Sequence, residues 1–215
     1  MMKENNKWML ACCIFAFTCT WPVQAQNEVK TILEQTSAKM KEYQAIELDF
    51  DVTIENTAVD AEDTYSGKAY VKGNKYRLDI GGMLTYFDGQ VIYSYMPDMQ
   101  EVNIRNPSAD DNEFMNPAAL FNIHKFNFKQ KLVSHTDNIA FIELVPTDSE
   151  KNFHKLAVWI NTVENSITKV KSFGKDGINL TIILKKVKSP KVIPPDSFFK
   201  FDVTEHPGVE VIDMR

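Results

Sequence analysis

The chain has 215 residues, of which 24 are Lys or Arg and 29 are Asp or Glu, giving a formal net charge of −5. This modest acidic charge, without a basic stripe, argues against a nucleic-acid-binding protein and against tight binding to an anionic membrane surface. All three cysteines, Cys12, Cys13 and Cys19, lie near the N-terminus. The chain beyond them therefore has no disulfide, thiol nucleophile or thiolate metal ligand.

Residues 1–25 have the pattern of a signal peptide. Lys3 and Lys7 precede an uncharged, mostly apolar stretch over residues 8–20, which is too short to span a bilayer comfortably. Small residues before Gln26 then predict cleavage after Ala25 and export to the periplasm. An apolar N-terminal helix of the folded protein is the alternative interpretation.

Residues 26–215 are expected to form one domain. Their number is sufficient for one hydrophobic core, and no internal repeat, low-complexity tract or linker divides them. We expect this domain to be a monomer.

The first predicted elements are an amphipathic helix and a strongly alternating strand. Over residues 27–43, apolar side chains recur at steps of three and four residues. Residues 46–55 then alternate strictly between apolar and polar side chains, with Leu48, Phe50 and Val52 on the apolar face. A period of two predicts a strand with one buried and one solvated face.

Short strands separated by tight turns follow. Strand patterns over residues 65–104 are broken by Gly73-Asn74, Gly81-Gly82, Asp88-Gly89 and Pro97-Asp98, which predicts an antiparallel meander. Five further strands are predicted, over residues 126–133, 139–145, 153–160, 167–173 and 178–187.

A second helix and a proline-rich segment complete the predicted elements. The helix is expected over residues 113–123, and an extended crossing segment with Pro190, Pro194 and Pro195 leads to the C-terminus. The fold class is thus mainly β with helices (α+β). Two arrangements remain open: a curved sheet packed solidly against its helices, or an unclosed antiparallel β-barrel with a helical lid over an apolar concave face.

No pattern of catalytic or metal-binding residues stands out. The sequence lacks G-x-S-x-G, P-loop, H-E-x-x-H and dinucleotide-binding motifs. Its four histidines are not spaced as metal ligands. Acidic clusters at residues 60–63 and 110–113 lack the spacing of a calcium loop. We therefore expect a non-enzymatic protein without a metal or cofactor.

The chain is rich in aromatic and thioether side chains, with 14 Phe, 7 Tyr and 9 Met. Such side chains suit a cavity for a deformable apolar ligand such as an acyl chain. The same side chains would also fill an ordinary core.

Taken in order, these segments resemble the LolA-like outer-membrane lipoprotein carrier family, and the resemblance covers essentially the whole chain after the signal segment. The motifs that carry it are residues 48–52 (LDFDV), 67–72 (GKAYVK), 75–80 (KYRLDI), 88–97 (DGQVIYSYMP), 100–102 (QEV), 116–121 (NPAALF) and 201–213 (FDVTEHPGVEVID).

The resemblance implies an unclosed β-barrel with helices as a lid over an apolar surface. It also implies a periplasmic chaperone that binds acylated lipoproteins, receives them from an inner-membrane lipoprotein-releasing transporter and passes them to an outer-membrane acceptor. The residues expected to line the cavity or lid are Leu48, Phe50, Val52, Leu78, Ile80, Tyr93, Tyr95, Met115, Leu120 and Phe121.

The sequence departs from the family pattern at three of these motif positions. Gly73 stands where the family commonly has a basic residue that latches the lid, and Leu78 and Tyr93 replace tryptophans. Two alternative functions of the same architecture remain open for this chain. One is an envelope sensor or lipid-binding module, and the other is a lipidated outer-membrane acceptor acylated at Cys12 or Cys19.

Overall fold

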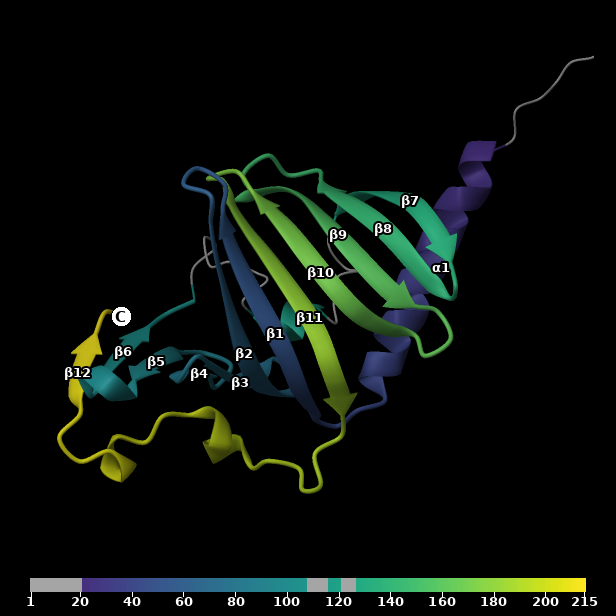
Figure 1. Cartoon of the computed structure of the whole chain (residues 1–215). Helices are drawn as coiled ribbons and strands as arrows, with labels where there is room; N and C mark the ends of the chain where they lie inside the picture. The colour runs from purple at the N-terminus through teal and green to yellow at the C-terminus, as the bar shows by residue number, and fades with distance from the viewer. Residues whose placement is uncertain (1–20, 108–115, 121–126) are drawn as a thin grey trace, which may run out of the picture.

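A computed structural model of the chain describes residues 21–107, 116–120 and 127–215. In these ranges one large sheet dominates, with a long N-terminal helix beside it (Figure 1). The helices are α1 (Trp21–Lys41) and α2 (Pro117–Leu120). The strands are β1 (Ile46–Asn56), β2 (Ala61–Lys72), β3 (Lys75–Ile80), β4 (Met83–Phe87), β5 (Ile92–Met96), β6 (Glu101–Arg105), β7 (Phe128–Thr136), β8 (Ile139–Pro146), β9 (Phe153–Asn161), β10 (Ser166–Gly174), β11 (Ile178–Lys188) and β12 (Glu210–Asp213).

The sheet is open, as expected. Its strand order among the described residues is β12-β6-β5-β4-β3-β2-β1-β11-β10-β9-β8-β7, so β12 and β7 form its two edges. Neighbouring strands are antiparallel except at one edge, where β12 runs parallel to β6. The expected antiparallel sheet is thus confirmed for all other pairs, and the parallel pair arises because the chain returns from β11 along the sheet before β12 begins.

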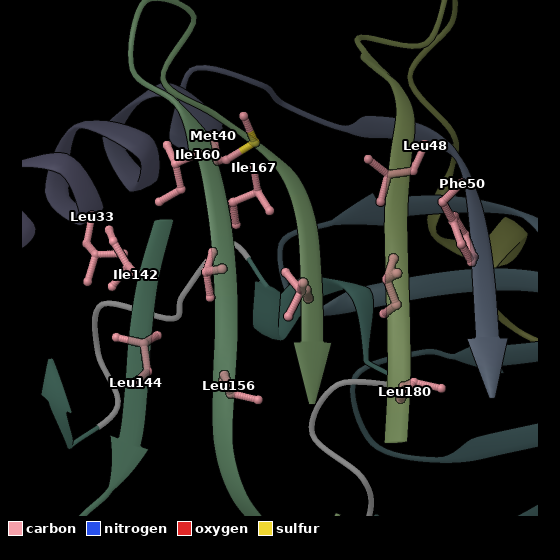
Figure 2. Packing of buried hydrophobic residues seen from close by; sticks show 14 of the residues in the cluster. Leu33, Met40, Leu48, Phe50, Ile142, Leu144, Leu156, Ile160, Ile167 and Leu180 are labelled. Carbon is pink, nitrogen blue, oxygen red and sulfur yellow. The ribbon is translucent and has the colours of Figure 1, made fainter. Parts of the chain in front are cut away.

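The main hydrophobic core lies on one face of the sheet, which we call the inner face. This face carries Leu48 on β1, Leu78 on β3 and Ile142 on β8, and the buried side of α1 packs against its β7–β10 end. Figure 2 shows Leu33 of α1 near Ile142, and Met40 near Ile160 and Ile167. The predicted helical periodicity is confirmed, because Val29, Ile32, Leu33, Thr36 and Met40 are all buried.

A second, smaller cluster lies on the opposite, outer face of β4–β6. Its members are Tyr86, Tyr93, Tyr95, Val102, Ile104 and Phe201. Phe201 comes from the C-terminal segment after β11, and its ring lies 4.9 Å from that of Tyr95 and 5.8 Å from that of Tyr86. The apolar side of the sheet therefore changes from the inner to the outer face between β3 and β4.

On the outer face of β1, acidic side chains pair with lysines of neighbouring strands. Glu47 lies 3.1 Å from Lys188, and Asp51 lies 2.6 Å from Lys185. The hydrogen bond from Lys185 lowers the pKa of Asp51. The polar half of the predicted alternation is thus confirmed as an ion-paired surface.

Several element boundaries differ from the expectations. The helix α1 begins at Trp21, before the predicted cleavage position, and cleavage after Ala25 stays a prediction. The strand β2 begins at Ala61, earlier than its apolar pattern indicates, because it pairs with β1 along its whole length. Of the second predicted helix the structure describes only α2. Within the described ranges, no helix is long and apolar enough to cross a membrane.

The alternation on β8 provides a direct test of this packing. Leu144 is fully buried on the inner face, whereas the adjacent Val145 is 40% exposed on the outer face. We expect Leu144→Ala to lower the free energy of unfolding by about 2–5 kcal/mol, and Val145→Ala to change it by less than about 0.5 kcal/mol. Urea unfolding of both variants measures the difference, and equal costs would contradict the assignment of faces.

Candidate functional site

The centre of the candidate site is the place where Phe50 of β1 crosses Gly67 of β2. These residues are directly opposite each other in the antiparallel pair. A Cβ atom on Gly67 would lie 2.4 Å from Phe50 Cζ and 2.6 Å from Cε2. Only glycine permits this contact, so the Phe50 ring lies directly over the backbone of β2.

The structure brings five of the predicted lining residues together around this contact. Leu48, Phe50, Val52 and Leu78 belong to the inner core cluster, and Ile80 packs against it. Ala118 of α2 belongs to the same cluster, and α2 lies against β2 and β3. The inner face of β1–β3 is therefore an apolar surface covered, among the described residues, by a helix of only four residues.

Tyr93 and Tyr95 lie elsewhere. Tyr93 pairs with Tyr86, which pairs with Arg77, and this row of cross-strand partners faces outward. Tyr95 packs against Phe201 and His206, with ring centroids 4.9 and 4.6 Å apart. Two of the predicted lining residues therefore belong to the outer cluster and not to the surface around Phe50.

The remaining predicted residues belong to the segment between β6 and β7. Met115 and Phe121 lie outside the described residues, as does the acidic cluster at residues 110–113. Leu120 is the last residue of α2, and its side chain is not described.

Other residues share the inner face although they were not singled out from the sequence. Ala69 and Val71 of β2 and Tyr76 of β3 are buried in the same cluster. Ala69 lies opposite Leu48, and Val71 lies opposite Ile46. Tyr76 in turn lies opposite Val71. Extending the alternation of β1 through the β2 and β3 pairings identifies them, because directly opposite residues share a face.

Gly73 occupies the turn between β2 and β3, with a φ of +62° that favours glycine. The lysines near it hold the C-terminal segment. Lys72 Nζ donates to the Pro194 carbonyl at 3.0 Å and to Asp196 Oδ1 at 2.9 Å, and Lys75 Nζ donates to Asp196 Oδ2 at 2.6 Å. Hydrogen bonds from Lys75 and then Lys72 lower the pKa of Asp196 to about 2.

A polar contact holds α1 at the other end of the sheet. His135 Nδ1 lies 3.0 Å from Glu28 Oε1, and its Nε2 lies 3.1 Å from Thr162 Oγ1. One imidazole thus connects α1, the end of β7 and the turn after β9. Among the described residues, the inner face is covered at this end by the 21-residue α1 and at β2 and β3 by the four-residue α2.

No group of three or more metal-ligating side chains occurs among the residues that the structure describes. The acidic cluster at residues 60–63 lies in the turn before β2 and in the first residues of that strand. The described part of the site is thus an apolar surface without a gathered polar centre.

Comparison with known protein families identifies the family of this chain. A family model described as "outer membrane lipoprotein carrier protein LolA" matches residues 42–202, a range that runs from before β1 to the end of the Phe198–Phe201 stretch. The chain belongs to the LolA family. No curated protein matches the chain.

Several solved structures are similar to this chain at low sequence identity, and the first of them shares its fold. An uncharacterized conserved protein from Thermus thermophilus is 8% identical, with a TM-score of 0.56, over 86% of this chain and 99% of that one. A LolA superfamily protein from Nitrosomonas europaea is 15% identical, with a TM-score of 0.47, over 81% and 98% of the two chains. A putative outer membrane lipoprotein-sorting protein domain from Vibrio parahaemolyticus is 12% identical, with a TM-score of 0.49, over 80% and 96%.

The contact between Phe50 and Gly67 predicts coupling between these two positions. Gly67→Ala should lower the free energy of unfolding by roughly 1–3 kcal/mol, because its methyl group must displace the Phe50 ring. In a Phe50→Leu background the same change should cost less, with a coupling energy of about 0.5–3 kcal/mol in urea unfolding. Additive costs in the double variant would show that the ring does not lie over Gly67.

The lysine contacts of Asp196 predict a pH dependence. Because the pKa of this carboxyl falls from 3.8 to about 2 on folding, its contribution is present above pH 3.8 and is lost as the pH falls to about 2. The protection of residues 196–200 from hydrogen exchange should exceed that in Asp196→Asn at neutral pH, and the two should converge as the pH falls below 2. A difference of undiminished size below pH 2 would contradict this account.

Proposed function

We propose that this chain is a periplasmic chaperone that binds the acyl chains of lipoproteins and carries them from the inner to the outer membrane. The observation that carries the proposal is the apolar inner face of β1–β3 in a chain of the LolA family. Family membership suggests the periplasm, in agreement with a signal peptide over residues 1–25. The working form would be the single domain of residues 26–215.

The chemistry of the cargo requires such a surface. An acyl chain in water costs about 0.8 kcal/mol for each exposed methylene group, so a carrier must cover most of its length. Aliphatic and aromatic contacts come from two strands on either side of β2, namely from Leu48, Phe50 and Val52 of β1 and from Leu78 and Ile80 of β3. The proposed ligand surface is made of these five residues.

Binding requires this surface to be uncovered, because Leu48 and Val52 are each only 1% exposed. The short helix α2 lies over β2 and β3, whereas the 21-residue α1 covers the β7–β10 end. Displacing α2 would break fewer contacts than displacing α1. We therefore propose that cargo enters under α2, and that Met115, Leu120 and Phe121 belong to the segment that moves.

The carrier would act without a catalytic step. Its partners would be acylated lipoproteins, an inner-membrane transporter that releases them and an outer-membrane acceptor that receives them. Such a carrier must also release its cargo, which favours a surface closed by a small element with few contacts over a permanently open groove.

A charge on the inner face tests the proposal. Phe50→Glu should abolish binding of a fluorescent fatty acid, because a carboxylate there would be buried against acyl methylenes. The matched control, Thr53→Glu, adds the same charge to the outward side of β1 and should leave binding unchanged. Circular dichroism establishes that both variants are folded, and full binding by folded Phe50→Glu would refute the assignment.

Photo-crosslinking gives an answer even if Phe50→Glu does not fold. A benzophenone side chain at Leu78, on the inner face, should crosslink to the acyl chains of a bound lipoprotein. The same group at Tyr95, on the outer face, should not, because that position packs against Phe201 and His206. Crosslinking from Tyr95 alone would place the ligand on the opposite face of the sheet.

A further inference from the structure

The outer face of β7–β10 combines lysines with aromatic rings. Cross-strand pairing places the side chains of alternate residues on this side of the four strands, away from α1 and the inner core. We call this surface the basic outer face, and its members are Lys129, Lys131, Phe141, Glu143, Val145, Lys155, Trp159, Lys169, Lys171 and Phe173. In a chain of net charge −5, these strand positions carry five lysines and one glutamate.

The aromatic rings form a stacked centre for this face. The rings of Phe141 and Trp159 are parallel within 1°, with centroids 4.6 Å apart. Lys169 Nζ lies 4.6 Å from the centroid of the Trp159 ring. Two more lysines, Lys155 and Lys171, place their ammonium groups 4.9 and 5.3 Å from the centroid of Phe173.

Two of the five lysines are neutralised by neighbouring carboxylates. Lys155 pairs with Glu143 at 2.6 Å, and Lys171 pairs with Glu55 of β1 at 2.8 Å. Lys129, Lys131 and Lys169 form no ion pair with the described residues. Their three charges are therefore available to an external partner.

We propose that the basic outer face docks the protein on a membrane surface that contains anionic lipids. Each lysine near such a surface strengthens binding by about fivefold, and tryptophan is the side chain best suited to the interface between headgroups and acyl chains. The exposed Val145 and, on β11, Ile183 extend the apolar part of this surface. The net charge of the chain is negative, whereas the charge of this face is positive.

The type of cation favours a lipid surface over an acidic protein. Bidentate recognition of carboxylates on a protein partner is characteristic of arginine, whereas lysine is a hydrated point charge that suits a fluid layer of headgroups. The chain's three arginines, Arg77, Arg105 and Arg215, lie outside β7–β10. The proposal concerns the face opposite the acyl-binding surface and goes beyond the proposed function.

Tryptophan fluorescence provides the measurement. The sequence contains only Trp8, Trp21 and Trp159, so processing after Ala25 would leave Trp159 as the single tryptophan, which can be excited selectively over the tyrosines. The processed protein, its mass verified, is titrated at low salt with vesicles of phosphatidylglycerol and phosphatidylcholine in equal parts. We expect a blue shift and quenching by brominated lipid, both reversed by salt, and neither with phosphatidylcholine alone.

Charge reversal supplies the matched comparison. Lys131→Glu combined with Lys169→Glu should weaken vesicle binding by about 25-fold or more, from about fivefold for each lysine. Lys41→Glu combined with Lys191→Glu makes the same change in net charge away from this face, and should preserve binding. Absence of vesicle binding, or equal loss in both variants, would overturn the proposal.

Two further outcomes separate this proposal from its alternatives. If polyglutamate shifts the Trp159 emission and vesicles do not, the face binds acidic protein and the membrane assignment is wrong. Fatty-acid binding should be unchanged in the Lys131→Glu, Lys169→Glu variant. Loss of vesicle binding with intact fatty-acid binding in the lysine variant would assign vesicle binding to the basic outer face. Loss of fatty-acid binding with intact vesicle binding in Phe50→Glu would assign fatty-acid binding to the inner face.

Discussion

The structure depends on the one-sided burial of β1. Leu48, Phe50 and Val52 enter the inner core while Glu47, Asp49 and Asp51 face outward toward lysines of the neighbouring strands. β1 lies in the middle of the strand order. Its register therefore fixes which side chains face inward and which face outward on β2 and β3 on one side and on β11 on the other. A shift by one residue would bury carboxylates, so the register is strongly specified.

The change of buried face between β3 and β4 explains the rest of the architecture. Tyr86 of β4 and Tyr93 and Tyr95 of β5 face outward and need a cover, which Phe201 and the C-terminal segment supply. The Lys72 and Lys75 contacts with Asp196 hold that segment against the β2–β3 turn. The C-terminal segment thus stabilises the outer cluster, whereas α2 lies against the inner face of β2 and β3 in the part of the chain that the structure describes.

Much of this fold could be predicted from the sequence. The strict alternation of β1, the turn glycines and the helical period of α1 each correspond to a local physical constraint, and the structure confirms them. The outward orientation of Tyr93 and Tyr95 could not be predicted, because local alternation places them on one face of β5 but only the cross-strand register shows which face of the sheet this is. The parallel pair β12–β6 depends on contacts between distant segments, which local patterns do not encode.

The candidate site was only partly predictable for the same reason. The β1 residues and Leu78 follow from alternation, whereas the role of Gly67 appears only when Phe50 is seen over it. The basic outer face is likewise invisible in the overall charge, since Lys129, Lys131, Lys155, Lys169 and Lys171 are spread over three strands and meet only through their register. Family membership identifies the carrier fold, whereas the place of α2 against β2 and β3 follows only from the structure.

The measurement that tests the carrier role most directly is release of a lipoprotein from its membrane. The purified protein is incubated with spheroplasts that hold a radiolabelled, outer-membrane-destined lipoprotein, and the soluble fraction is examined for a complex. The account predicts a soluble one-to-one complex of this chain with the labelled lipoprotein. Label that stays on the spheroplasts, while a known carrier releases it in parallel, would contradict the proposed function.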